Sequence, residues 1–213
     1  MKSIYCVLKS GGAYAEQHVQ WLKKQCDTHA PGVSFFCLTD LSTIHGVRTL
    51  PLQHDWSGWW AKIELFKYDD VFYLDLDTVI LNDIRYMLSL SDFHAIRNFK
   101  NHKRWWKVVL GSAVMTWGKS PRFIYDDFTP ALTRKYENKK KQNRWGDQGY
   151  IHDALKGRFN ALQDIFPRRI LSYKLDQLGN TPPEADIICF HGYPRPWEAD
   201  EPWVPHLEHA DNH

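Results

Sequence analysis

The chain has 213 residues, which is the usual size of one globular domain. Its 27 Lys and Arg residues nearly balance 25 Asp and Glu residues, so a net charge of +2 excludes a protein that mainly coats nucleic acid. Apolar residues make up 43% of the chain, enough for a buried core, and this excludes a disordered chain or a disulfide scaffold.

The first elements alternate between strand and helix patterns. Residues 3–8 are a short apolar run, and the following segment has one apolar helical face formed by Ala15, Val19, Leu22 and Cys26. Residues 33–38 repeat the strand pattern, a second helical pattern surrounds Lys62, and residues 71–74 predict a third strand. Continuous apolar strands between amphipathic helices indicate an α/β fold whose mostly parallel sheet is covered on both faces.

The later elements are less regular. Ser120 is a good N-cap ahead of Pro121, and Asp147 is expected to cap another helix. After these, a Pro- and Trp-rich segment is expected to wrap back over the sheet. Further strands are predicted over residues 93–96, 113–117 and 187–190.

The apolar run at the amino terminus is too short for a signal-peptide core or a membrane span, so we expect a cytoplasmic protein without a transmembrane segment. The cysteines show no C-x-x-C pair and no zinc-ligand spacing with histidine. We therefore expect reduced core residues at Cys6, Cys26, Cys37 and Cys189.

Two carboxylates follow the third predicted strand at alternate positions, Asp75 and Asp77. Residues i and i+2 of a strand point to the same side, and the carboxyl end of a parallel strand is where α/β sheets bind ligands. Two like charges so close favour a bound hard cation such as Mg2+ or Mn2+. The alternative is a strand-end turn whose aspartates only cap the following residues, because so short a pattern recurs by chance.

A second polar motif follows the last predicted strand, in residues 190–197. The imidazole of His191 could complete a metal shell, and Arg195, fixed between two prolines, could pair with phosphate oxygens. The alternative is a histidine packed at a strand end and an arginine lying over Trp197. Both interpretations stay open at this point.

Taken together, these segments resemble the glycogenin-like glycosyltransferases, family 8 and its relatives, which have a GT-A fold. The resemblance covers most of the chain and is carried by five blocks in the family's order: residues 58–66, 71–81 with Asp75-x-Asp77, 111–115, 146–149 and 191–197. It implies one GT-A domain over residues 1–213, with a nucleotide-binding half over 1–81 and a sugar and acceptor half over 82–213.

The resemblance also implies a reaction. The chain would be a hexosyltransferase that uses a nucleotide-diphosphosugar, a UDP-sugar, with Mn2+ or Mg2+ held by Asp75, Asp77 and His191. The acceptor would be a glycan, a glycolipid or a protein, and the anomeric configuration would be retained. Nucleic acid is not expected as a partner, because the whole chain is nearly neutral.

Individual roles follow from the same resemblance. Asp147 and Gln148 match the catalytic pair beside the reacting sugar carbon, where they would bind hydroxyls and steady the oxocarbenium-like sugar. The remaining donor-binding residues are expected to be Val7, Leu8, Lys62, Leu76, Ser112, Gly192 and Arg195, together with the two aspartates. Stacking surface for the acceptor is expected among Trp59, Trp60, Trp105, Trp106 and Trp145.

The sequence departs from the family pattern at three of these places. Gly111 and Ala113 flank Ser112 where the family has Asn and Gly, so the sugar specificity does not transfer. Arg195 stands where the family commonly has lysine. Two other functions remain as alternatives: a haloacid-dehalogenase-like phosphatase with Asp75 as nucleophile, and a carbohydrate-binding protein without catalysis, which the 10 tryptophans would suit.

Overall fold

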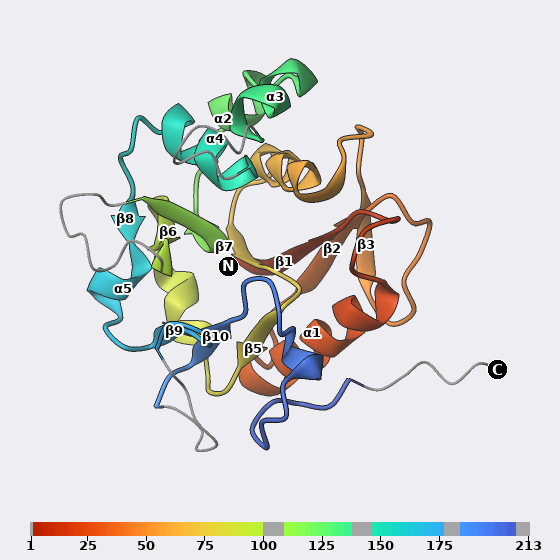
Figure 1. Cartoon of the computed structure of the whole chain (residues 1–213), viewed down its shortest axis with the longest axis vertical. Coiled ribbons are helices and arrows are strands. Elements are labelled where there is room, and N and C mark those ends of the chain that lie inside the picture. The colour runs from red at the N-terminus through yellow and green to blue at the C-terminus, as the bar shows by residue number, and fades with distance from the viewer. Residues whose placement is uncertain (1, 100–108, 138–145, 177–183, 208–213) are drawn as a thin grey trace.

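The computed structural model describes residues 2–99, 109–137, 146–176 and 184–207. Figure 1 shows the path of the chain. The strands are β1 (Ser3–Leu8), β2 (Phe35–Thr39), β3 (Arg48–Pro51), β4 (Val71–Leu74), β5 (Thr78–Ile80), β6 (His94–Arg97), β7 (Leu110–Trp117), β8 (Asn160–Ala161), β9 (Ile170–Ser172) and β10 (Ile187–Cys189). The helices are α1 (Glu16–His29), η1 (Gly58–Lys67), η2 (Arg85–Ser89), α2 (Phe123–Asp126), η4 (Pro130–Leu132), α3 (Thr133–Tyr136), α4 (Gly146–Ala154), α5 (Leu162–Ile165) and η5 (Pro196–Glu198).

The described strands form a large mixed sheet in the order β3-β2-β1-β4-β7-β6-β8. Strands β1 to β4 pair in parallel, as do β6 and β8, whereas β7 runs antiparallel to both of its neighbours. The predicted α/β fold with a mostly parallel sheet is therefore confirmed. Parallel strands are buried on both faces, which is why β1 and β4 are continuous apolar runs in the sequence.

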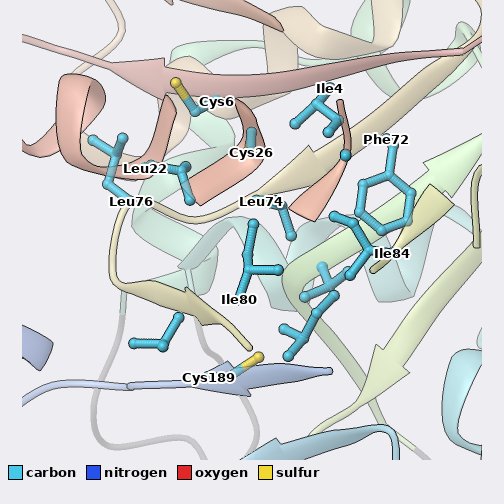
Figure 2. Packing of buried hydrophobic residues seen from close by; sticks show 14 of the residues in the cluster. Ile4, Cys6, Leu22, Cys26, Phe72, Leu74, Leu76, Ile80, Ile84 and Cys189 are labelled. Carbon is cyan, nitrogen blue, oxygen red and sulfur yellow. The ribbon is translucent and has the colours of Figure 1, made fainter. Parts of the chain in front are cut away.

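Two hydrophobic clusters cover the two faces of this sheet. One contains α1 and the side chains of Ile4 and Cys6, and Figure 2 shows it packed around β4 and β5. The other contains η1, α2 and α4, together with Tyr5 and Tyr73. Successive residues of β1 and β4 point to opposite clusters, as the alternation of strand side chains requires. The two faces are therefore filled by helices from different parts of the chain.

A smaller sheet, in the order β5-β10-β9, lies beside the main one. Strand β10 pairs antiparallel with β5, so that Cys189 lies opposite Thr78. The backbone N–H of Phe190 also donates to the carbonyl oxygen of Asp77 at 3.2 Å. This pairing brings the segment after β10 to the chain just after β4, more than a hundred residues away in sequence. The sequence patterns did not predict this second sheet.

The structure corrects two predicted helix starts. Ser120 does not cap a helix, because α2 begins at Phe123 and the Ser120 hydroxyl donates to the carbonyl oxygen of Phe66 at 2.5 Å. Asp147 is not an N-cap, because α4 already begins at Gly146 and the Asp147 side chain contacts Ser112. In both cases the polar side chain bonds to a residue far away in the sequence, and it does not cap the helix.

The described cysteines, Cys6, Cys26, Cys37 and Cys189, are buried and unpaired, which confirms their prediction as reduced core residues. None of the helices in the described ranges combines the length and the apolar character needed to cross a bilayer.

Candidate functional site

A cleft of about 1000 Å3 opens at the carboxyl ends of β1 and β4. Ligands of α/β folds bind at this edge, where the strands end and the loops begin. All the residues predicted to bind donor or metal or to act in catalysis line this one cleft: Val7, Leu8, Lys62, Asp75, Leu76, Asp77, Ser112, Asp147, Gln148, His191, Gly192 and Arg195. The structure thus brings together segments from both ends of the chain, although their roles stay predictions.

Helix η1 forms one wall of the cleft, and its 3-10 geometry decides which side chains enter it. Side chains three residues apart lie above one another in such a helix. Trp60 and Ile63 form a buried row against the core, with exposed fractions of 1% and 0%. Trp59 and Lys62 form the row that faces the cleft. The helix therefore buries one tryptophan and presents its neighbour.

Lys62 is the centre of a buried polar network. Its ammonium lies 2.9 Å from Asp75 Oδ1 and 3.1 Å from Asp147 Oδ2, and only 7% of its side chain is exposed. It also donates to the Ser112 hydroxyl at 3.2 Å, and that hydroxyl donates to Asp147 Oδ2 at 2.8 Å. The Tyr73 hydroxyl donates to Asp75 Oδ1. One lysine thus fixes side chains from β7, α4 and the end of β4.

The charge state of this lysine follows from its partners. Burial alone would lower the pKa of Lys62, but the charges of Asp147 and Asp75 and their hydrogen bonds raise it above its usual value. The ammonium therefore stays charged at neutral pH. It is a fixed positive charge at the edge of the cleft next to Asp147.

A second ion pair closes the other side of the cleft. Arg195 donates to Asp77 Oδ2, and the Tyr14 hydroxyl donates to the same oxygen at 2.9 Å. The guanidinium also lies over the Tyr14 ring, 4.8 Å from its centroid. Burial and the neighbouring charge of Asp75 raise the pKa of Asp77 to about 6. The pair holds the carboxyl-terminal segment against the chain just after β4, and its two residues are 118 positions apart in the sequence.

The Asp75-Leu76-Asp77 segment is a turn, not the extended strand that was predicted. Strand β4 ends at Leu74, and the N–H of Thr78 donates to the carbonyl oxygen of Asp75 at 3.2 Å. A turn, and not strand alternation, therefore places the two carboxylates. Both still line the cleft, but Asp75 binds Lys62 and Asp77 binds Arg195.

The third predicted metal ligand, His191, also has a protein partner. Its Nε2 lies 2.7 Å from the Ser172 hydroxyl, and its ring stacks near Phe99 at 5.9 Å between centroids. Among the described residues, no three His, Cys, Asp or Glu side chains are gathered as a metal site. The donor set of two carboxylates and an imidazole still suits Mn2+ or Mg2+ chemically. Metal binding therefore stays a prediction, in which the metal would compete with Arg195 for the Asp77 carboxylate.

Gly111, which departs from the family pattern, has a packing reason. A Cβ at this position would lie 2.8 Å from Ile96 Cγ1, at an irregularity in the β6–β7 pairing. A side chain at this position would have to displace the buried side chain of Ile96. Ser112, next to Gly111, lines the cleft.

Several lining residues were not among those predicted from the sequence to bind donor or metal or to act in catalysis. Tyr73 and Tyr14 hydrogen-bond the two aspartates, and Glu137 accepts the indole N–H of Trp60 at 2.6 Å. Tyr73 could have been found from its place just before the aspartates, but the others depend on long-range packing. Of the five tryptophans expected to stack on an acceptor, Trp60 is core and Trp59 is 57% exposed in the cleft. The other three lie outside the described residues: Trp105, Trp106 and Trp145.

Comparison with solved structures identifies the fold. The chain matches the galactosyltransferase LgtC, crystallised with donor and acceptor sugar analogues, at a TM-score of 0.64 and 13% identity over 93% of this chain and 90% of LgtC. The chain has the fold of a GT-A glycosyltransferase. It also matches the glycosyltransferase GlyE of Streptococcus pneumoniae at a TM-score of 0.64 and 15% identity over 94% of this chain. Mouse xyloside xylosyltransferase 1 matches at a TM-score of 0.51 and 13% identity, over 90% and 97% of the two chains.

This chain spans 57% of the length of GlyE. No protein-family profile matches the sequence, and a search of curated proteins finds no match.

Proposed function

We propose that the protein is a glycosyltransferase that moves a hexose from a UDP-sugar to an acceptor hydroxyl, with retention of the anomeric configuration. The observation that carries the proposal is the single cleft lined by every residue of the predicted donor and catalytic sets. These residues come from six separate segments, and they meet at the ligand-binding edge of a fold that the chain shares with LgtC and GlyE.

In this reaction the bond between the sugar C1 and the diphosphate oxygen breaks, and a bond from C1 to the acceptor oxygen forms. The acceptor hydroxyl proton goes to the departing phosphate. Asp147 and Gln148 would bind the sugar beside C1 and favour its positively charged form. Ser112 and Lys62 hold the Asp147 carboxylate, so its oxygens are fixed before the sugar arrives.

The leaving group would be stabilised at the other side of the cleft. Asp75, Asp77 and His191 would hold Mn2+ or Mg2+, whose charge stabilises the departing diphosphate. Arg195 would also bind the diphosphate. Its guanidinium can release the Asp77 carboxylate and bind a phosphate oxygen instead, because carboxylates and phosphates accept hydrogen bonds from arginine in the same way. The Arg195–Asp77 pair would then be the ligand-free arrangement of the donor site.

The alternatives fit the site less well. In a phosphatase Asp75 would be a nucleophile, but here its Oδ1 accepts from both Lys62 and Tyr73, which lowers its reactivity. A carbohydrate-binding protein has no need for the charged groups that surround Asp77. A glycosyltransferase would use both the Lys62 network around Asp75 and the charged groups around Asp77.

The decisive experiment is calorimetric titration of UDP into the protein with Mn2+, then with EDTA, and then with Asp77→Asn. We expect micromolar binding that falls at least about tenfold without metal or without the Asp77 carboxylate. Asp83→Asn is the matched control, because Asp83 lies outside the cleft in an exposed pair with Arg85. Hydrolysis of UDP-glucose and UDP-galactose, followed by proton NMR of the released anomer, tests the donor and retention.

Absence of UDP binding by the wild type under every condition would contradict the proposal. Turnover of p-nitrophenyl phosphate that is lost in Asp75→Asn would favour the phosphatase instead. Sugar binding that needs neither nucleotide nor Asp77 would favour the carbohydrate-binding protein.

A further inference from the structure

One large apolar side chain is left exposed inside the cleft. The large hydrophobic side chains exposed in the described ranges are Trp59, Tyr86, Phe123, Ile165, Leu175 and Tyr193. Of these, only Trp59 lines the cleft, with 57% of the residue exposed. Single exposed apolar residues on a convex surface are ordinary, but a tryptophan presented into a ligand cleft is placed where a ligand can cover it.

The position of Trp59 is fixed by the backbone of Gly146. A Cβ on Gly146 would lie 2.5 Å from Trp59 Nε1, so the indole rests directly on this glycine. Gly146 has a φ of +59°, which side chains other than glycine rarely adopt. It begins α4, and the next two residues are Asp147 and Gln148. The indole is therefore held beside the predicted catalytic pair.

The same cleft wall carries hydrogen-bonding groups around the indole. Trp59 lies one 3-10 turn from Lys62, and Glu137 and Gln148 line the same space. Figure 1 shows α3 and α4 together on one side of the molecule, away from the blue carboxyl-terminal segment that carries Arg195. Trp59 therefore belongs to the wall made by η1 and the start of α4, and Arg195 and Asp77 belong to the opposite one.

An aromatic face among hydroxyl-binding groups selects one class of ligand. A pyranose ring has axial C–H groups that pack on an indole face and equatorial hydroxyls that bond to carboxylates and amides. An acyl chain has no polar groups and would cover the Gln148 amide without giving it a hydrogen-bond partner. A neutral sugar can pack its C–H groups on the Trp59 indole and bond its hydroxyls to the polar groups beside it.

From this arrangement we propose that Trp59 is the stacking platform for a neutral pyranose of the acceptor, which makes the acceptor a glycan or glycoside. The inference rests on the proposed glycosyltransferase function, and it names the acceptor class of that site. Trp59 decides acceptor binding, whereas Arg195 and Asp77 serve the donor.

The test is saturation-transfer NMR with methyl β-D-galactopyranoside and methyl β-D-glucopyranoside, in the presence of UDP and Mn2+. Wild-type protein is expected to saturate the ring protons of one sugar face. Trp59→Ala should weaken glycoside binding about tenfold, and Trp59→Phe should keep part of it, because a smaller ring retains some of the stacking. Phe123→Ala is the matched control, since Phe123 is 45% exposed and lies outside the cleft.

A UDP titration of each variant separates the donor from the acceptor. UDP affinity within about twofold of wild type, together with the loss of glycoside binding in Trp59→Ala, supports the proposal. No glycoside binding by wild type at tens of millimolar, or equal binding by Trp59→Ala, overturns it. A parallel loss of UDP affinity also overturns it, because Trp59 would then serve the donor. Trp59-dependent glycoside binding by a protein that binds no UDP would keep the sugar platform and reject the transferase.

Discussion

Two buried lysines at opposite ends of the main sheet have opposite environments. Lys62, at the carboxyl end, is 5% exposed and lies within 3.1 Å of two carboxylates. Lys2, just before β1 at the amino end, is also 5% exposed, but it donates to two neutral acceptors, the Leu90 carbonyl and the Thr116 hydroxyl. Burial lowers the pKa of Lys2 to about 8, and Asp70 offsets this only in part.

The difference shows that only the carboxyl end of the sheet gathers groups of opposite charge around its buried lysine. At the carboxyl end, positive and negative groups are gathered in an open cleft and keep one another charged. At the amino end, one ammonium is buried against neutral hydrogen-bond acceptors and is only partly compensated by Asp70, at a cost in stability. The clustering of compensating charge thus marks the candidate site more clearly than burial does.

The largest expected effect is on the cleft network. Lys62→Met removes the ammonium while keeping most of the side-chain volume, so Asp75 and Asp147 lose their counter-charge. We expect the free energy of unfolding to fall by about 3 kcal/mol, as when one partner of a buried ion pair is removed. Urea denaturation at pH 7 measures it, with Lys119→Met as control, because Lys119 is 88% exposed in its pair with Asp69. A loss below about 1 kcal/mol would mean that the carboxylates find other partners or water.

Sequence patterns predicted the parts of this site that are formed by residues close to one another in the sequence. The apolar runs of β1 and β4 and the apolar face of α1 are visible without any partner, because burial on both faces removes polar residues from such strands. The position of Asp75 and Asp77 after β4 followed from the same run. These local signals were sufficient to place the cleft at the correct edge of the sheet.

The sequence could not show contacts between distant segments. The pairing of β5 with β10 joins short strands that lie far apart in the sequence, and it helps to bring Arg195 to Asp77. Ser120 carries a helix-capping signal, yet it binds Phe66 in the folded chain. Likewise, adjacent Trp59 and Trp60 look alike in the sequence, and only the 3-10 geometry of η1 separates the buried one from the exposed one.

A smaller loss of stability is expected when the Arg195–Asp77 pair, on the opposite side of the cleft, is removed. Arg195→Ala leaves Asp77 bonded to Tyr14 beside the charge of Asp75, so unfolding should become easier by about 1–2 kcal/mol. Arg195→Lys should recover part of this, since lysine keeps the charge without the planar fork. Mn2+ is expected to restore more stability to Arg195→Ala than to wild type, because the arginine no longer competes for Asp77.

Thermal unfolding with and without Mn2+ measures both effects. Arg85→Ala is the control, because its pair with Asp83 is half exposed and screened by solvent. Equal losses in the two variants would contradict the assignment of Arg195 to the site.

The smallest expected effect concerns Lys2 and is a pH dependence. Because the pKa of Lys2 is about 8 when folded and 10.5 in its ordinary state, the unfolded chain binds more protons between these values. Stability from this group therefore rises as pH increases above 8, in contrast to the usual alkaline loss. Between pH 7.5 and 9.5 the wild type should gain about 1–2 kcal/mol over Lys2→Met, whose neutral side chain has no such titration. Urea denaturation at the two pH values measures the difference, again with Lys119→Met as control. Parallel pH profiles for wild type and Lys2→Met would mean that water reaches the Lys2 ammonium. Lys2 and Lys62 would then differ in their hydrogen-bond and ion-pair partners but not in the effect of burial on their charge.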